Sequence, residues 1–279
     1  MAEQRGYYGR PVLKEPVWKP EVPLYFFLGG LAGASAGLAF FARQAGNRGL
    51  ARRALLTAAA AIMLSPPLLI ADLGRPERFL NMMRVFKPTS PMSVGTWLLS
   101  SFAASVTGAL VTRWRWLEAA AAGLGLPLTT YTAVLISDTS IPAWHLARRE
   151  LPFVFAGGAA ASAGGVAAVL NPPAQAGPAR RLAVLGGVTE LAAVQVMERR
   201  LGEFGEAYRQ PGVARLAGAA KTAIAAGSLL MLVAGRRWGP AAAAGTLLAG
   251  GSLAERFAVM AAGRESARAS VGEATVQAG

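Results

Sequence analysis

Apolar residues along the chain gather in long blocks separated by polar segments. There are eight such blocks, at residues 24–42, 54–71, 93–112, 117–137, 151–170, 182–198, 213–235 and 240–262. A helix of about 20 apolar residues crosses the ~30 Å hydrocarbon core of a bilayer, and the blocks are close to that length. We therefore predict an all-α integral membrane protein with eight transmembrane helices. An even number of spans places both termini on one face of the membrane.

The polar segments divide the chain further. We expect two four-helix bundles, at residues 23–137 and 151–262, joined by a loop at residues 138–150. A polar strip of residues 1–22 precedes the first bundle, and a polar tail of residues 263–279 follows the second. The strip is too polar for a cleavable signal peptide and too poor in apolar residues to fold alone, so we expect it to order against a partner.

Glycine is frequent inside the blocks. The first and fifth blocks contain Gly29, Gly30, Gly33, Gly37, Gly157, Gly158, Gly164 and Gly165. Lipid gives helices no hydrophobic reason to associate, so close contact between small residues has to hold them together. We interpret nearly all of these glycines as helix-packing positions, since a phosphate-binding loop is not credible inside an apolar span.

The composition supports a membrane protein and argues against a nucleic-acid-binding one. Hydrophobic residues make up 53% of the chain and charged residues only 15%, with a mean hydropathy of +0.39. A soluble domain usually has about 25% charged residues. The net charge of +13 comes mostly from Lys and Arg between the apolar blocks, where membrane proteins collect them.

The loops after the odd-numbered blocks are short and basic, with ten arginines against the single acid Glu118. Their arginines are Arg43, Arg48, Arg52, Arg53, Arg113, Arg115, Arg180, Arg181, Arg236 and Arg237. A raw count of Lys and Arg places the termini in the cytoplasm, because the other face carries the remaining 18. The density of arginine in the short loops favours the opposite orientation, with the termini outside the cytoplasm. We prefer this orientation.

Residue types that hold redox centres are almost absent. The chain contains no Cys and one His, His145. It therefore has no ligands for a Cys-bound iron–sulfur cluster or a bis-histidine haem, and we predict no metal site. His145 is expected to be a surface residue. A redox centre acting here would belong to a partner or to a diffusible molecule.

Two charged residues are predicted at membrane depth. Glu190 lies in the middle of the sixth block and Lys221 about nine residues into the seventh. A charge at the centre of a bilayer costs at least about 2.5 kcal/mol, so each is a candidate functional residue. If the two helices pack together, Glu190 and Lys221 meet at one depth. They form either a structural ion pair, which we favour, or part of a proton or ion path.

A second group of polar residues gathers at helix ends on the terminus-bearing face. It comprises Tyr25, Asp72, Tyr131 and Asp138. Tyr25 and the nearby Trp144, each taken alone, are better explained as interfacial aromatic residues. Taken together, the four residues belong to three helices of the first bundle and outline a pocket with an apolar floor and a polar rim.

The segment Asp72-Leu73-Gly74-Arg75-Pro76-Glu77-Arg78-Phe79 and the later run Pro88-Thr89-Ser90-Pro91-Met92-Ser93 resemble the NrfD family of polysulfide-reductase-type membrane subunits. The resemblance extends over essentially the whole chain. It implies a membrane anchor for a four-cluster iron–sulfur protein and, through it, a molybdopterin catalytic subunit. It also implies a non-covalently bound quinone, menaquinone or ubiquinone, near the face where the iron–sulfur protein docks.

By this resemblance, Tyr131 and Asp72 fall on quinone-site positions, and Tyr25 stands where polysulfide reductase has a histidine. Tyr25 and Tyr131 would hold the quinone oxygens, while Asp72 and Asp138 would exchange protons with the terminus-bearing face. The partner would dock on Arg75, Arg78, Arg84 and Lys87 together with the N-terminal strip. The chain alone has no electron source, so it would not be active by itself.

Two other functions remain open at this point. The chain could be a purely structural anchor whose pocket holds lipid. Alternatively, it could be a proton- or ion-translocating subunit that uses Glu190 and Lys221.

Overall fold

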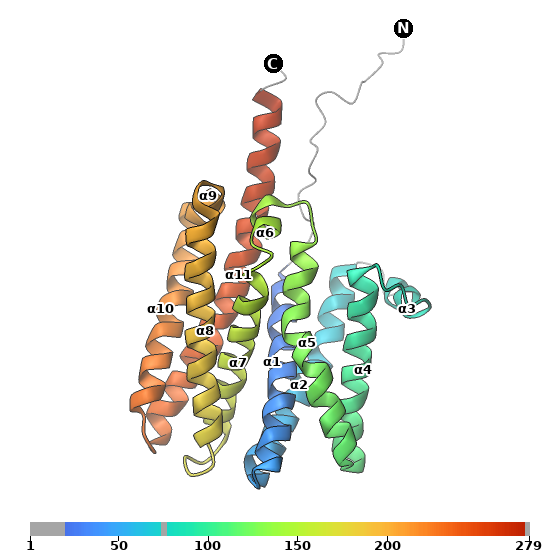
Figure 1. Cartoon of the computed structure of the whole chain (residues 1–279), viewed down its shortest axis with the longest axis vertical. Helices are drawn as coiled ribbons and strands as arrows, with labels where there is room; N and C mark the ends of the chain where they lie inside the picture. Colours follow the sequence, from blue (N-terminus) through green and yellow to red (C-terminus); the bar gives the residue numbers. More distant parts are fainter. Residues whose placement is uncertain (1–19, 74–76, 277–279) are drawn as a thin grey trace.

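The computed structural model describes residues 20–73 and 77–276, which form a set of long helices lying side by side (Figure 1). Eight of the described helices have 20 residues or more. Seven of the predicted apolar blocks lie within one of them, and the block 213–235 extends two residues beyond the end of its helix. The long helices are α1 (Glu21–Gln44), α2 (Arg48–Leu73), α4 (Pro91–Thr112), α5 (Arg115–Ser137), α7 (Leu151–Leu170), α8 (Gly177–Leu201), α10 (Pro211–Val233) and α11 (Trp238–Val276). The connections contain the short helices α3 (Glu77–Met83), α6 (Pro142–Leu146), η1 (Gly202–Gly205) and α9 (Glu206–Arg209).

Six of the long helices are long and apolar enough to cross a membrane. They are α1, α2, α4, α5, α7 and α10, and they make this a multi-pass membrane protein. Helices α8 and α11 are as long but more polar: α8 carries Glu190 and Glu198, and α11 carries Glu255 and Arg256. The prediction of eight spans therefore depends on these two helices.

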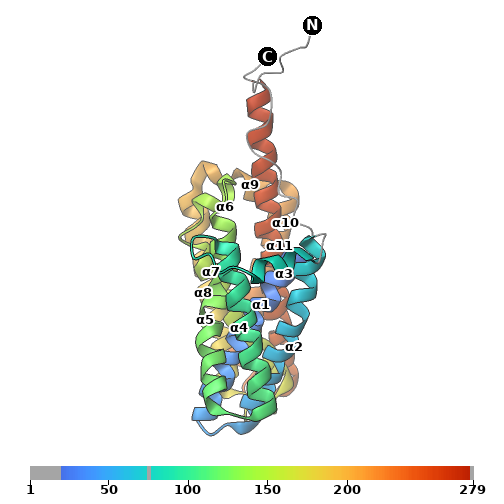
Figure 2. The same ribbon diagram turned by 90° about the vertical axis from the view of Figure 1, so that its right-hand side faces the viewer.

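The connections fall at two ends of the molecule (Figures 1 and 2). The four short connections α1–α2, α4–α5, α7–α8 and α10–α11 gather at one end, which we call the arginine-rich end. Helices α3, α6 and α9 lie at the other end, where α1 begins and α11 finishes, and we call it the terminus-bearing end. The long helices thus run up and down in alternation, as the spacing of the apolar blocks predicts.

Helices α1 and α7 occupy the middle of the molecule. Helix α1 packs against α2 and α5, α7 packs against α8 and α11, and the two central helices contact each other. In their most apolar stretches, 61% of the residues of α1 and 67% of those of α7 are buried, against 39% or less in the other four spans. The outer helices keep apolar side chains on the surface, where lipid would contact them.

Glycines bring several helix pairs into backbone contact. A Cβ atom on Gly33 of α1 would lie 2.4 Å from the carbonyl oxygen of Gly125 on α5. A Cβ on Gly157 of α7 would lie 2.6 Å from the backbone nitrogen of Glu190 on α8. The packing interpretation is confirmed at these glycines, whereas Gly29 and Gly37 have open space around the position of a Cβ.

The polar segment after residue 262 does not leave the helix. Helix α11 continues to Val276 and projects beyond its neighbours at the terminus-bearing end (Figures 1 and 2). Near the base of this projection, the indole of Trp144 packs where a Cβ on Gly263 would lie and donates a 2.7 Å hydrogen bond to the carbonyl oxygen of Val259. The interpretation of Trp144 as an interfacial residue is wrong, because α6 turns the indole inward and buries it completely.

The contact at Gly33 makes a direct prediction. Replacing Gly33 with Ala forces α1 and α5 apart and should destabilise the protein by about 1–3 kcal/mol, as overpacking typically does. The check is the midpoint of thermal unfolding in detergent, with Gly37→Ala in the same helix as the control. Equal midpoints for the two variants would show that the α1–α5 contact tolerates a methyl group.

Candidate functional site

The run Pro88-Thr89-Ser90-Pro91-Met92-Ser93 forms the start of α4. Ser90 is the N-cap and accepts a hydrogen bond from the Ser93 backbone N–H, and Pro91 occupies the first turn, where a missing N–H costs nothing. The Ser93 hydroxyl accepts a bond from the Lys87 N–H (3.0 Å) and donates one to the Val85 carbonyl (3.1 Å). The motif therefore holds the connection between α3 and α4 in a defined shape.

This helix start also positions Tyr131 of α5. The Tyr131 hydroxyl donates a 2.9 Å hydrogen bond to the carbonyl oxygen of Pro91. Its ring lies where any side chain on Gly95 would be, since a Cβ there would come within 1.8 Å of the ring. Tyr131 is thus fixed between the α4 cap and a glycine one turn further along α4.

Tyr25 approaches Tyr131 from α1. Tyr25 is 4% exposed, so its interpretation as an interfacial aromatic is wrong, and its helix α1 packs directly against α5, which carries Tyr131. The Tyr25 ring contacts Phe26 (5.9 Å between centroids), which in turn contacts Phe155 of α7 (6.0 Å). The structure thus brings together two phenol donors beside an apolar aromatic cluster.

The predicted carboxylates lie nearer the surface. Asp72 is half-buried at the end of α2. Asp138 is the exposed C-cap of α5. Both are at the terminus-bearing end, the position from which a carboxylate can exchange protons with water.

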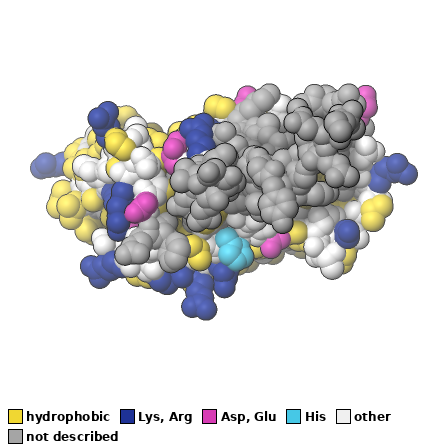
Figure 3. Space-filling view, turned by 90° about the horizontal axis from the view of Figure 1, so that it is seen from above, with side chains coloured by type: hydrophobic (Ala, Val, Ile, Leu, Met, Phe, Trp, Pro, Cys, Tyr) yellow, Lys and Arg dark blue, Asp and Glu magenta, His cyan; other side chains and the backbone are white. Residues whose placement is uncertain are grey.

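The predicted docking residues are only partly described. Arg84 and Lys87 are exposed in the α3–α4 connection. Arg75 and the N-terminal strip of residues 1–19 lie outside the described residues, and so does the side chain of Arg78 on α3. His145 is exposed, as predicted (cyan in Figure 3), and one of its ring nitrogens lies 3.2 Å from Arg148.

A buried charged cluster lies between α7, α8 and α11. Glu190 of α8 is completely buried, with Oε2 accepting a 2.6 Å hydrogen bond from Ser252 and Oε1 3.6 Å from Nη1 of Arg256. The Arg256 guanidinium donates to the Phe155 carbonyl (2.8 Å) and lies over the Phe155 ring (4.0 Å to its centroid). Gly158 makes room for this pair, because a Cβ there would be 2.5 Å from Glu190 and 2.7 Å from Arg256.

The cluster has more charge and more polar atoms than it can pair. Glu255, next to Arg256 on α11, is 1% exposed, so α8 and α11 bury two carboxyl groups and one guanidinium in this region. Among the described residues, Glu190 Oε1, Glu255 Oε2 and Arg256 Nε have no hydrogen-bond partner. Unpaired buried polar atoms are costly, so this arrangement favours uptake of water molecules or a proton.

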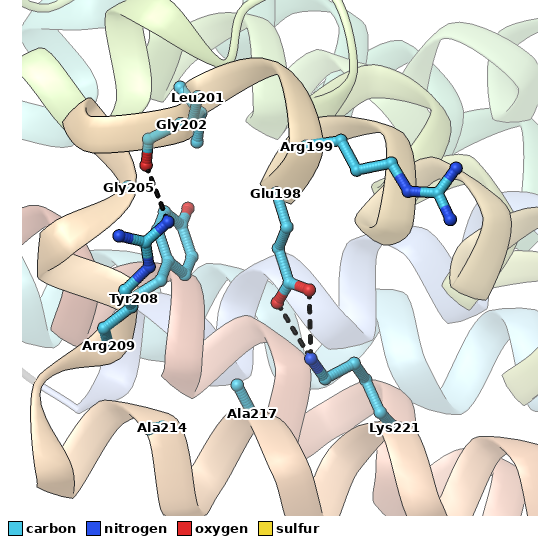
Figure 4. A pocket seen from close by; sticks show the side chains of 10 residues that line it. All are labelled: Glu198, Arg199, Leu201, Gly202, Gly205, Tyr208, Arg209, Ala214, Ala217 and Lys221. Atoms are coloured by element: carbon cyan, nitrogen blue, oxygen red, sulfur yellow. Dashed lines mark hydrogen bonds and ion pairs between the residues drawn. The ribbon is translucent and has the colours of Figure 1, made fainter.

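A cavity of about 580 Å³ opens between the end of α8, α9 and the start of α10 (Figure 4). Lys221 of α10 lines it and forms a salt bridge with Glu198 of α8, at 2.9 and 3.1 Å. Tyr208 also lines it, and its buried hydroxyl has no hydrogen-bond partner among the described residues. Burial first, and then the nearby charges of Glu255 and Glu198, raise the pKa of Tyr208 above its ordinary value. The cavity is therefore lined by a phenol without a hydrogen-bond partner among the described residues and by the Glu198–Lys221 salt bridge.

The predicted pair of Glu190 with Lys221 is wrong. Lys221 pairs with Glu198, and Glu190 pairs with Arg256. Equal depth along two helices does not decide which sides of them face each other. Glu190 and Glu198 are eight residues apart and so point about 80° apart around α8, Glu198 towards α10 and Glu190 towards α7 and α11.

Five residues of this region escaped prediction as site residues, namely Glu198, Tyr208, Ser252, Glu255 and Arg256. The sequence did contain a signal for two of them. Glu255 and Arg256 are adjacent charges inside the predicted apolar block 240–262, where charges are expensive.

The helices, their apolar surfaces and the buried ion pair define a helical multi-pass membrane protein. The chain belongs to the NrfD family, since residues 12–249 match the family model described as "Polysulphide reductase, NrfD". A comparison with curated proteins finds no match. Proteins of the family are membrane subunits of oxidoreductase complexes.

The buried ion pair leads to a stability prediction. Arg256→Met leaves Glu190 buried without its partner and should destabilise the protein by about 3–5 kcal/mol. Adding Glu190→Gln to this variant should restore part of the loss, as seen in thermal unfolding in detergent.

The matched control is Lys221→Met, which removes a cation from a partly exposed pair and should cost about 1 kcal/mol or less. If Arg256→Met unfolds at the same temperature as this control, the Glu190–Arg256 pair does not hold the three helices together.

Proposed function

We propose that this protein is the membrane anchor subunit of a respiratory oxidoreductase and exchanges electrons between that complex and the membrane quinone pool. Its partners would be a four-cluster iron–sulfur protein and, beyond it, a molybdopterin catalytic subunit. In this proposal α8 and α11 also span the membrane, giving eight spans in two four-helix bundles. The termini, and the docked partner, lie outside the cytoplasm.

The observation that carries the quinone site is the pair of phenols, Tyr25 and Tyr131, near the terminus-bearing ends of α1 and α5. Each phenol can donate one hydrogen bond to a carbonyl oxygen, and the neighbouring Phe26 and Phe155 suit an apolar ring. The residues thus fit a quinone in their chemistry. Bound there, a quinone would supply two-electron, two-proton redox chemistry close to the partner's nearest cluster.

The residues of the chain would divide this work. Tyr131 would turn its hydroxyl from the Pro91 carbonyl to a quinone oxygen, and Tyr25 would orient the ring from α1. Asp72, and Asp138 further out, would carry protons between this site and water. Arg84 and Lys87 would give the partner a basic contact surface beside it.

Removing the Tyr131 hydroxyl tests the quinone site. Tyr131→Phe keeps the ring against Gly95 but loses one hydrogen bond, so kcat/KM for quinol should fall about tenfold in the purified complex. Tyr208→Phe, a phenol in the other half of the molecule, is the matched control and should leave quinol turnover unchanged. Normal kinetics for Tyr131→Phe would remove Tyr131 from the quinone site.

The buried cluster favours a second function, proton movement through α7, α8 and α11. The cavity at Glu198, Tyr208 and Lys221 would admit water from the terminus-bearing end, and Glu255 and Glu190 would take up protons in turn. The observation in its favour is the excess of buried carboxyl groups over guanidinium groups, which a mobile proton would neutralise.

Two substitutions separate these functions in the complex reconstituted into vesicles. Glu190→Gln should abolish proton movement, measured with an internal pH-sensitive dye, while quinol turnover continues. Asp72→Asn should lower quinol turnover itself, measured by absorbance. If both variants retain normal turnover and proton movement while assembling normally, the purely structural anchor becomes the better interpretation.

A further inference from the structure

A groove of about 500 Å³ lies at the arginine-rich end, between the start of α8 and the end of α10. Arg180 and Arg181, in the first turns of α8, form its polar end. Leu185 of α8 and Leu232 of α10 form its walls and are 67% and 62% exposed. Because α10 is a membrane span, the exposed Leu232 faces the region that acyl chains occupy, and Leu185 lines the same groove.

No carboxylate among the described residues forms a salt bridge with either arginine. Arg180 is half-buried, and its Nε atom is buried without a hydrogen-bond partner in the described part of the chain. The connections at this end contain one acid, Glu118, which pairs with Arg43 at 2.6 Å. An anion from outside the protein is therefore the natural partner, and the start of α8 adds the positive end of a helix dipole.

Exposed tryptophans mark the level of the lipid headgroups at this end. Trp114 and Trp116, at the start of α5, are 56% and 61% exposed, and Trp238, at the start of α11, is 55% exposed. Exposed Trp side chains collect at the membrane–water interface. Arg180 and Arg181 begin the neighbouring helix at the same end, so their guanidinium groups lie where phosphates do.

We propose that this groove binds an anionic phospholipid, with its phosphate between Arg180 and Arg181 and an acyl chain along Leu185 and Leu232. The site is independent of the quinone and proton functions, because it lies at the opposite end from the paired phenols. A phospholipid accounts for both halves of the groove, the unpartnered guanidinium and the exposed apolar walls.

The full chain, purified in mild detergent, provides the test. Phosphatidylglycerol should raise its midpoint of thermal unfolding more than phosphatidylcholine does, and mass spectrometry should find anionic phospholipid retained after detergent exchange. Arg180→Gln with Arg181→Gln should weaken the apparent affinity for phosphatidylglycerol about tenfold or more. Arg180→Lys with Arg181→Lys, which keeps the charges, should retain most of the affinity.

The matched control is Arg113→Gln with Arg115→Gln, which removes the same charge from the same end, and it should behave like the unaltered protein. An equal loss in this control would mean that the whole basic end attracts lipid without a site. Stabilisation by inorganic phosphate alone, with no lipid retained and no effect of Leu232→Ser, would replace the lipid with a free anion. Either result overturns the proposal.

Discussion

The close approach of α7 to α8 and α11 is the contact on which the second half of the molecule depends. Lipid does not drive helices together, so contact has to come from atoms that fit closely. Gly157 lets the backbone of α8 reach α7, and Gly158 leaves the space that Glu190 and Arg256 fill. Close packing of the three helices excludes solvent from the ion pair, and this packing is possible only because Gly157 and Gly158 have no side chains. Packing and charge in this half therefore form one unit.

The first half is held together by a different kind of interaction, hydrogen bonding and packing of neutral side chains. There the cap of α4 and the glycine at position 95 hold Tyr131, and α1, which carries the buried Tyr25, packs against α5. These phenols are neutral groups, and they need no counter-ion. Helix α1 contacts α7 directly, so the two halves, one with neutral donors and one with charges, share a central pair of helices.

The fold was largely predictable because it follows from the order of apolar and polar residues along the chain. Blocks of apolar residues predicted each long helix and the alternation of its ends. The site was less predictable, because it depends on the direction in which each side chain points around its helix axis. Glu190 and Lys221 were picked out as charges inside apolar blocks, but no hydropathy pattern shows which side of α8 faces α11. The Ser90–Ser93 motif was recognisable by resemblance, whereas its bond partner Tyr131 lies 40 residues away and emerges only from the packing of α4 against α5.

Helix α11 combines the buried charges, the contact with Trp144 and the projecting segment in one continuous element. From Arg256 to Val276 it extends about 30 Å, and an α-helix of that length resists bending. Trp144 clamps it at Val259 and Gly263, between the charges and the free end. If the helix tilts as a rigid rod about this contact, the projecting part after Gly263 and the part before Val259 move in opposite directions. A protein bound to the projecting part of α11 would thereby change the distance between Arg256 and Glu190.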